Sequence, residues 1–318
     1  MPGRTARTAM AGRRSATSLS GARTRPSRAR WPPRSPSSRA SMSNLRGPDR
    51  QTGEDPVRLV DSHGHLQADR FDGDVDAVLA AARAAGVERI LVPGWNLGSS
   101  ARALELVERH AWLDAAVGIH PHDAARIDDA GWTRIVGWSG DPRVVAIGET
   151  GLDYDRVFSP IDDQLANLRR NLELAVDTGK PAILHCRSRA GARDAQDALL
   201  AELGRFGGDP PRTIVHSFSG PVDYARAMLD LGAVISFSGL VFRRGEEASA
   251  DVARIVPADR FLVETDSPFL SPPGAPRGRN EPAWVGITAR WLAACRDEPV
   301  VEIGHRLVAT YDRVTGRP

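Results

Sequence analysis

The sequence has 318 residues, of which 41% are apolar and 26% charged, and it is long enough to bury one large core or two small ones. No stretch approaches the roughly 18 apolar residues of a membrane-spanning helix, so we expect no membrane association. The net charge is +2, but residues 1–48 hold eleven arginines and no Asp or Glu, so the rest carries −9. An acidic body excludes a general electrostatic binder of nucleic acid. Two cysteines exclude a disulfide framework and favour a cytoplasmic location.

Residues 1–56 form a leader that is rich in Arg, Ser and Pro and has almost no apolar periodicity. Such a composition cannot bury enough surface to order itself, so we predict a disordered N-terminal extension before a single domain at 57–318. The leader resembles a transit peptide in composition, but no apolar signal core follows. The plainer explanation is an overextended reading frame, with Met42 as the alternative start.

Short apolar runs then alternate with segments of helix length. The runs that we predict as strands are, in chain order, 57–60, 89–93, 113–119, 144–148, 182–185, 213–216, 233–237 and 260–264. The clearest helices are expected at 74–85, 99–110 and 162–178, the last ended by Gly179. Apolar strands joined by helices indicate a parallel sheet covered on both faces. Eight units favour an α/β fold of the (β/α)8 TIM barrel type; the alternative, a doubly wound open sheet, is weakened because no GxGxxG follows a strand.

The first strand leads into Asp61-Ser62-His63-Gly64-His65. Side chains alternate between the two faces of a strand, so His63 and His65 project to the same side. Two adjacent imidazoles on one side can hold a divalent ion. Sites of parallel barrels gather at the carboxyl ends of the strands, so later strands are expected to add ligands there.

Four further strand ends carry such side chains, namely Glu149, His185, His216 and Asp266. Taken singly, a histidine there is more often a hydrogen-bonded core group, and a carboxylate often caps the next helix. Together with the first strand they predict one constellation of four histidines and two carboxylates. This set suits two divalent ions bridged by a shared carboxylate, and it leaves Mg²⁺, Mn²⁺ and Zn²⁺ open.

Seven motifs in order give the chain a specific resemblance to a known family. They lie at 60–66, 118–122, 148–154, 184–187, 215–220, 263–268 and 276–282. With them the sequence resembles TatD-family metal-dependent deoxyribonucleases, within the amidohydrolase-like barrels, from about 59 to 314. The resemblance implies one ion on His63, His65, Glu149 and Asp266, and a second on Glu149, His185 and His216. It also implies that Asp266 accepts a proton from the attacking water.

Several other residues are expected to contact the substrate. Arg187 shares the inward side of its strand with His185, and its guanidinium matches two phosphate oxygens, although a structural salt bridge is the alternative. The other candidates are Arg277, Asn280, His120 and Tyr154. Trp95, after the second strand, either stacks on a base or packs in its loop.

The function expected from these features is hydrolysis of phosphodiesters at DNA ends or in short single-stranded DNA, with no obligate protein partner. One alternative keeps the metals and changes the bond: an amidohydrolase or deacylase acting on a small ester or amide. Another is no enzyme at all, with the barrel as an interaction scaffold and the Arg-rich leader as a nucleic-acid tether.

Overall fold

The computed structural model describes residues 57–208, 210–276 and 278–317. Two predictions fall outside these ranges: the disordered leader at 1–56, with the alternative start Met42, and the substrate contact of Arg277. Within them, no helix combines the length and apolar content that crossing a membrane requires. The fold and the site are therefore built from residue 57 onward.

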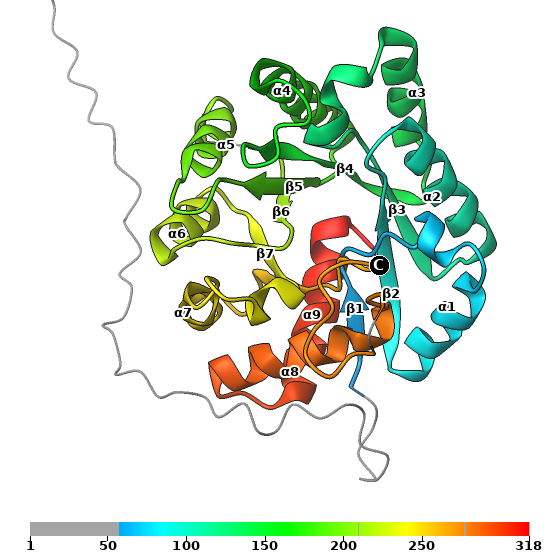
Figure 1. Cartoon of the computed structure of the whole chain (residues 1–318), viewed down its shortest axis with the longest axis vertical. Coiled ribbons are helices and arrows are strands. Elements are labelled where there is room, and N and C mark those ends of the chain that lie inside the picture. The colour runs from blue at the N-terminus through cyan, green and yellow to red at the C-terminus, as the bar shows by residue number, and fades with distance from the viewer. Residues whose placement is uncertain (1–56, 209, 277, 318) are drawn as a thin grey trace, which may run out of the picture. The chain divides into compact units, whose positions relative to one another are not determined.

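Eight parallel strands form one sheet in which each strand pairs with the next along the chain (Figure 1). The strands are β1 (Leu59–Asp61), β2 (Val87–Pro93), β3 (Leu113–Val117), β4 (Val144–Asp153), β5 (Ala182–Arg187), β6 (Thr213–Val215), β7 (Val234–Phe237) and β8 (Phe261–Val263). The helices that follow them are α1 (Val75–Ala84), α2 (Leu97–Arg109), α3 (Asp129–Ser139), α4 (Ile161–Thr178), α5 (Asp194–Gly204), α6 (Val222–Asp230), α7 (Ala248–Ile255), α8 (Val285–Arg296) and α9 (Val300–Thr315). The predicted (β/α)8 barrel is confirmed, and the open-sheet alternative is wrong.

The barrel closes between β8 and β1 through residues just beyond the ends of these strands. The Asp266 backbone N–H donates to the carbonyl of His63 at 2.8 Å, and that of His65 donates to the carbonyl of Ser267 at 2.7 Å. Gly64 and Ser267 form a parallel bridge. We call this junction the β8–β1 seam, and it is made of the residues that flank the predicted metal ligands.

The longest strand, β4, continues five residues beyond its predicted end at 148. The predicted strand of 144–148 was therefore too short. Gly148 and Gly151 have φ angles of +134° and +139°, which favour glycine. A Cβ atom on Gly151 would lie 1.9 Å from the carbonyl oxygen of His185, so this glycine lets β4 run close against β5. The prediction that Gly179 ends the fourth helix is confirmed, with φ at +63°.

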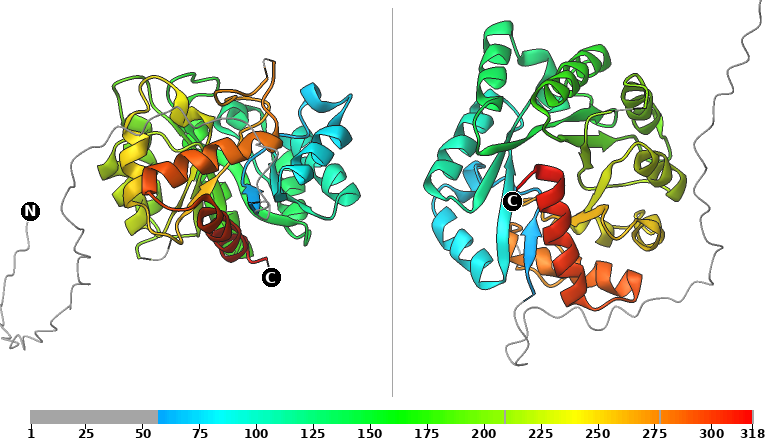
Figure 2. Two further views of the ribbon diagram at one scale, coloured as in Figure 1. Left: turned by 90° about the horizontal axis from the view of Figure 1, so that it is seen from below. Right: turned by 180° about the vertical axis from the view of Figure 1, so that it is seen from behind.

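Helix α9 lies across one end of the barrel (Figure 2). The Tyr311 hydroxyl donates to the carboxylate of Asp114, near the start of β3, at 2.8 Å. Arg317 pairs with the same fully buried carboxylate. A side chain on Gly304 would collide with the backbone of Arg58, before β1. Helix α9 therefore covers the amino-terminal ends of the strands, and the opposite mouth carries the site.

Candidate metal centre

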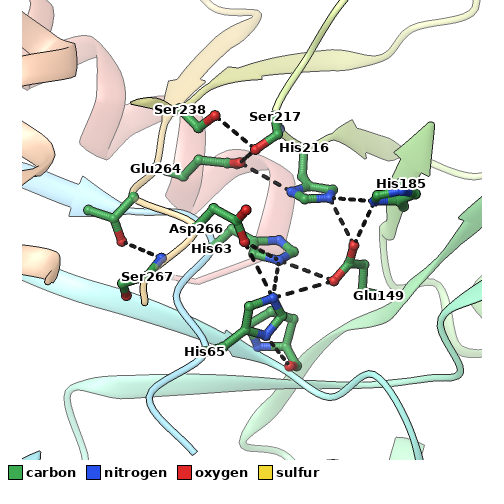
Figure 3. Close-up of polar contacts among 12 residues, drawn as sticks. His63, His65, Glu149, His185, His216, Ser217, Ser238, Glu264, Asp266 and Ser267 are labelled. Atoms are coloured by element: carbon green, nitrogen blue, oxygen red, sulfur yellow. Dashed lines mark hydrogen bonds and ion pairs between the residues drawn. The ribbon is translucent and has the colours of Figure 1, made fainter. Parts of the chain in front are cut away.

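The two histidines after β1 lie side by side at the barrel mouth (Figure 3). Their Nε2 atoms are 3.2 Å apart, and both side chains are buried. Asp61 lies one layer below, where it accepts hydrogen bonds from the backbone N–H and hydroxyl of Thr265 at 2.9 and 2.5 Å. The strand alternation predicted this shared side, and Asp61 fixes the segment that presents both imidazoles.

Glu149, from β4, stands between two pairs of imidazoles. Its Oε2 lies 3.3 Å from His63 Nε2 and 3.6 Å from His65 Nε2. Its Oε1 lies 3.1 Å from His185 Nδ1 and 2.8 Å from His216 Nε2. Each carboxylate oxygen thus faces a different pair, which is the arrangement that a bridging ligand between two cations needs.

The charge on Glu149 is kept by its surroundings. The side chain is only 3% exposed, and this burial alone would raise its pKa. Interaction with the neighbouring imidazoles, that of His216 first, outweighs burial and holds the pKa of Glu149 well below its usual range. An ionised carboxylate inside a ring of imidazoles is a ready ligand for a divalent cation.

Asp266 closes the group on the side of β8. Its Oδ1 lies 3.4 Å from His65 Nε2 and 3.9 Å from His63 Nε2. Its side chain is 14% exposed, more than those of the other predicted ligands, so it lies nearest the opening. Its backbone belongs to the β8–β1 seam, which sets the position of the carboxylate.

The donor atoms fit divalent ions by chemistry and by spacing. Three overlapping sets each place one donor atom per residue within 4.8 Å of one another: His63, His216 and Asp266; His63, His65 and Glu149; and His120, Glu149 and His185. Two imidazole nitrogens that face each other at 3.2 Å, as in His185 and His216, can share at most one proton. A cation satisfies both nitrogens, and imidazole with carboxylate suits Zn²⁺ or Mn²⁺, with Mg²⁺ less favoured.

His120, which was predicted to contact the substrate, lies beside Glu149. Its Nε2 lies 3.3 Å from Glu149 Oε1, and its Nδ1 accepts the backbone N–H of His122 at 3.1 Å. Burial lowers the pKa of His120 to about 3, so the ring is neutral near pH 7. The structure therefore places His120 among the candidate metal donors.

Two outer carboxylates hold the rear nitrogens of the imidazoles. Glu264 Oε1 lies 3.2 Å from His216 Nδ1 and accepts the backbone N–H and hydroxyl of Ser217 at 2.7 and 2.8 Å. Asp153 Oδ2 lies 2.7 Å from His122 Nε2 and 3.4 Å from His185 Nε2. Such partners fix the ring orientation and the tautomer of a metal-binding histidine. Sequence analysis assigned no role to Glu264, although its place beside Asp266 at a strand end was a usable signal.

The remaining predicted substrate residues divide into two kinds. Arg187 lies at the mouth, half exposed, with one guanidinium nitrogen 3.6 Å from Asp153. Asn280 is fully buried; its Nδ2 donates to the Thr265 carbonyl at 2.7 Å, and its Oδ1 accepts the backbone N–H of the next residue at 3.0 Å. Tyr154 is buried in the hydrophobic core. Asn280 and Tyr154 thus make structural contacts in this structure, and the expectation that they contact the substrate stays a prediction.

This fold and site define a barrel hydrolase of the metal-dependent class. The family model described as TatD related DNase matches residues 60–316, and the chain belongs to this family, as its motifs predicted. The chain is therefore a hydrolase of this family, and the scaffold alternative is wrong.

The relatives and solved structures agree with this assignment. The chain is 35% identical to the uncharacterized metal-dependent hydrolase YabD of Bacillus subtilis, over 77% of this chain and 94% of that one. It is 38% identical to the 3'-5' ssDNA/RNA exonuclease TatD of Cronobacter turicensis, over 70% and 84%. The crystal structure of the TatD homologue YJJV from Escherichia coli superposes with a TM-score of 0.75 at 32% identity, covering 82% of this chain and 99% of that one.

Proposed function

We propose that this protein is a nuclease that removes nucleotides from the end of a single DNA strand with the help of two divalent ions, Mg²⁺, Mn²⁺ or Zn²⁺. The observation that carries the proposal is Glu149, whose two oxygens face separate imidazole pairs within a buried cluster. The names of relatives such as the Cronobacter 3'-5' ssDNA/RNA exonuclease support the single-stranded substrate and attack from the 3′ end.

The proposed division of ligands follows the two oxygens of Glu149. His63, His65 and Asp266 join its Oε2 side, and His185 and His216 join its Oε1 side with His120 beside them. When bound, the two ions supply activation of water and neutralisation of charge on the phosphate. Glu264 and Asp153 keep the imidazoles oriented through their rear nitrogens.

Two residues are assigned to the chemistry and to substrate binding. Asp266 accepts a proton from the attacking water, since its carboxylate is the donor nearest the opening. Arg187 binds two oxygens of the phosphate, because its guanidinium lies half exposed at the mouth and presents a planar fork. The cytoplasmic location and the absence of an obligate protein partner stay predictions.

The test uses a 5′-labelled single-stranded oligonucleotide with each end blocked in turn, assayed with each metal and with EDTA. We expect ladders of shortened product that disappear when the 3′ end is blocked or EDTA is added. Loss of an outer partner of a metal ligand lowers activity about 10- to 100-fold, so Glu149→Gln is expected to lower kcat by more than about 100-fold. The matched control is Glu173→Gln, which makes the same carboxylate-to-amide change at an exposed position on α4.

The second candidate function uses the same metal centre but hydrolyses a different kind of bond. A barrel amidohydrolase or deacylase would hydrolyse a small ester or amide, and the structure of N-acetyl-D-glucosamine-6-phosphate deacetylase from Mycobacterium smegmatis shares the fold at 15% identity and a TM-score of 0.53. That likeness shows the fold alone. Cleavage of p-nitrophenyl acetate by metal-loaded protein that leaves every oligonucleotide intact would favour this alternative, and undiminished turnover in EDTA would refute both.

A further inference from the structure

Two phenylalanine side chains at the mouth of the barrel are exposed to solvent. Phe158, between β4 and α4, is 63% exposed, and Phe269, after β8, is 53% exposed. Across the described ranges no other Phe, Tyr or Trp side chain is exposed. The other large apolar side chains that are exposed there are aliphatic, and each lies on a helix: Val136, Ile161, Val176 and Val301. A single exposed apolar side chain needs no explanation, but two phenyl rings beside the same site mark a surface where a ligand can bind.

Phe269 contacts a candidate metal ligand, and Phe158 contacts the neighbouring imidazole of His122. The ring centroids of Phe158 and His122 are 4.7 Å apart, with the rings edge to face. The ring centroids of Phe269 and His65 are 6.1 Å apart. A continuous row of ring contacts joins the two through the imidazoles of His65, His63, His216, His185 and His122. The phenyl groups therefore stand at the two ends of the metal-binding cluster.

The backbone beside each ring is anchored. The Ser159 hydroxyl donates to the carbonyl of His122 at 2.9 Å and accepts the backbone N–H of Ala125 at 3.1 Å. The Phe269 backbone N–H donates to the carbonyl of Asp266 at 2.8 Å. Both rings are thus carried by backbone that is tied to the site itself, so binding a ligand there would cost little backbone entropy.

We infer that Phe158 and Phe269 stack on unpaired nucleobases on either side of the scissile phosphate, which rests on the proposed nuclease function. Every base has a flat π-face that an aromatic ring can cover regardless of sequence. The domain after residue 48 carries −9, so it offers no long electrostatic track for the strand, and stacking supplies affinity that charge does not. Base pairing hides these faces, so the substrate class is single-stranded.

Trp95 is not part of this pair. Its ring is half buried and meets His65 edge to face at 5.1 Å. It packs beside a predicted ligand, which is the loop-packing alternative raised from the sequence.

The experiment combines variants with altered substrates. Phe158→Ala, Phe269→Ala and the matched control Val176→Ala, an exposed apolar residue at the far end of α4, are assayed with metal on a labelled oligonucleotide. A second oligonucleotide has the same backbone with abasic sites beside the cleaved bond. Loss of one stacked base weakens binding roughly 5- to 150-fold, so we expect KM to rise by that range in each phenylalanine variant on the normal strand.

The decisive result is the difference between substrates. On the abasic strand the KM of the phenylalanine variants should equal that of the wild type. On the normal strand, replacing either phenylalanine by tryptophan should restore the wild-type KM. Val176→Ala should leave the KM unchanged on both strands. Quenching of 2-aminopurine beside the cleaved bond reports the same stacking without turnover. An equal rise in KM on both strands, or none on either, would overturn the stacking role while wild-type cleavage still stood. Failure of the wild type to cleave any strand would instead overturn the nuclease function and the inference with it.

Discussion

Replacing Thr265 by valine tests whether the β8–β1 seam depends on a charged hydrogen bond. The Thr265 hydroxyl donates to Asp61 Oδ2 at 2.5 Å and accepts the backbone N–H of Ser267 at 3.2 Å. Valine keeps the shape and removes both bonds, whereas Thr265→Ser keeps the hydroxyl. Burial raises the pKa of Asp61 to about 7, and the Thr265 bonds oppose that rise, so losing the hydroxyl raises the pKa further.

The size of the effect follows from the state of Asp61. At pH 8 its carboxylate is ionised; a hydrogen bond to a charged group contributes about 1.5–3 kcal/mol, and the stranded Ser267 N–H adds about 1 kcal/mol. We expect Thr265→Val to lower the free energy of unfolding by about 2.5–4 kcal/mol at pH 8. At pH 5 the folded carboxyl is protonated and the bond to it is neutral, so the loss shrinks to about 1.5–2.5 kcal/mol.

The sign of the pH dependence is fixed by the raised pKa. Between about pH 4 and pH 7 folded Asp61 holds a proton that the unfolded chain has lost, so the stability from this group falls as pH rises through that window. Urea unfolding at pH 5 and pH 8, followed by circular dichroism in EDTA, measures the valine, serine and wild-type proteins. A valine–serine difference that does not grow with pH would refute this role of Asp61.

Three further predictions concern other parts of the molecule. Glu264→Gln is expected to weaken Zn²⁺ binding by about 10- to 100-fold in calorimetry of chelator-treated protein, because His216 loses its orienting partner; unchanged affinity would contradict that role. Tyr311→Phe should lower the free energy of unfolding by about 1.5–3 kcal/mol by removing a donor to buried Asp114, with kcat unaltered at the other end of the barrel. A fall in kcat would show that the two ends are coupled. Mn²⁺ at one hundred times its Kd should stabilise the folded protein by about 2.7 kcal/mol over EDTA, and an unshifted melting curve would count against a metal site.

The fold was predictable because its signals are local. Alternation along a strand put His63 and His65 on one side, and glycine after a helical segment marked the end of α4. Corresponding strand ends meet at one mouth in a parallel barrel, which is how Glu149, His216 and Asp266 could be grouped from positions far apart in the sequence.

The contacts that sequence analysis did not foresee depend on tertiary neighbours. In the sequence Asn280 is a polar loop residue, but in the structure its amide donates a hydrogen bond to the Thr265 carbonyl. His120 is drawn to the cluster by the position of Glu149, which no spacing reveals. The full length of β4 could not be predicted, because Gly151 is needed only for the close approach to the carbonyl of His185 on β5. The exposure of Phe158 depends on how its loop packs, which no local sequence pattern reveals.

The β8–β1 seam also sets the order in which the centre can arise during translation. Ligands from the first strand rest on backbone bonds to Asp266 and Ser267, which the ribosome adds about two hundred residues later. A nascent chain that stops before Phe261 holds both early histidines without the segment that fixes them. The hydrolytic centre is therefore expected to come into being only once the last strand has left the exit tunnel.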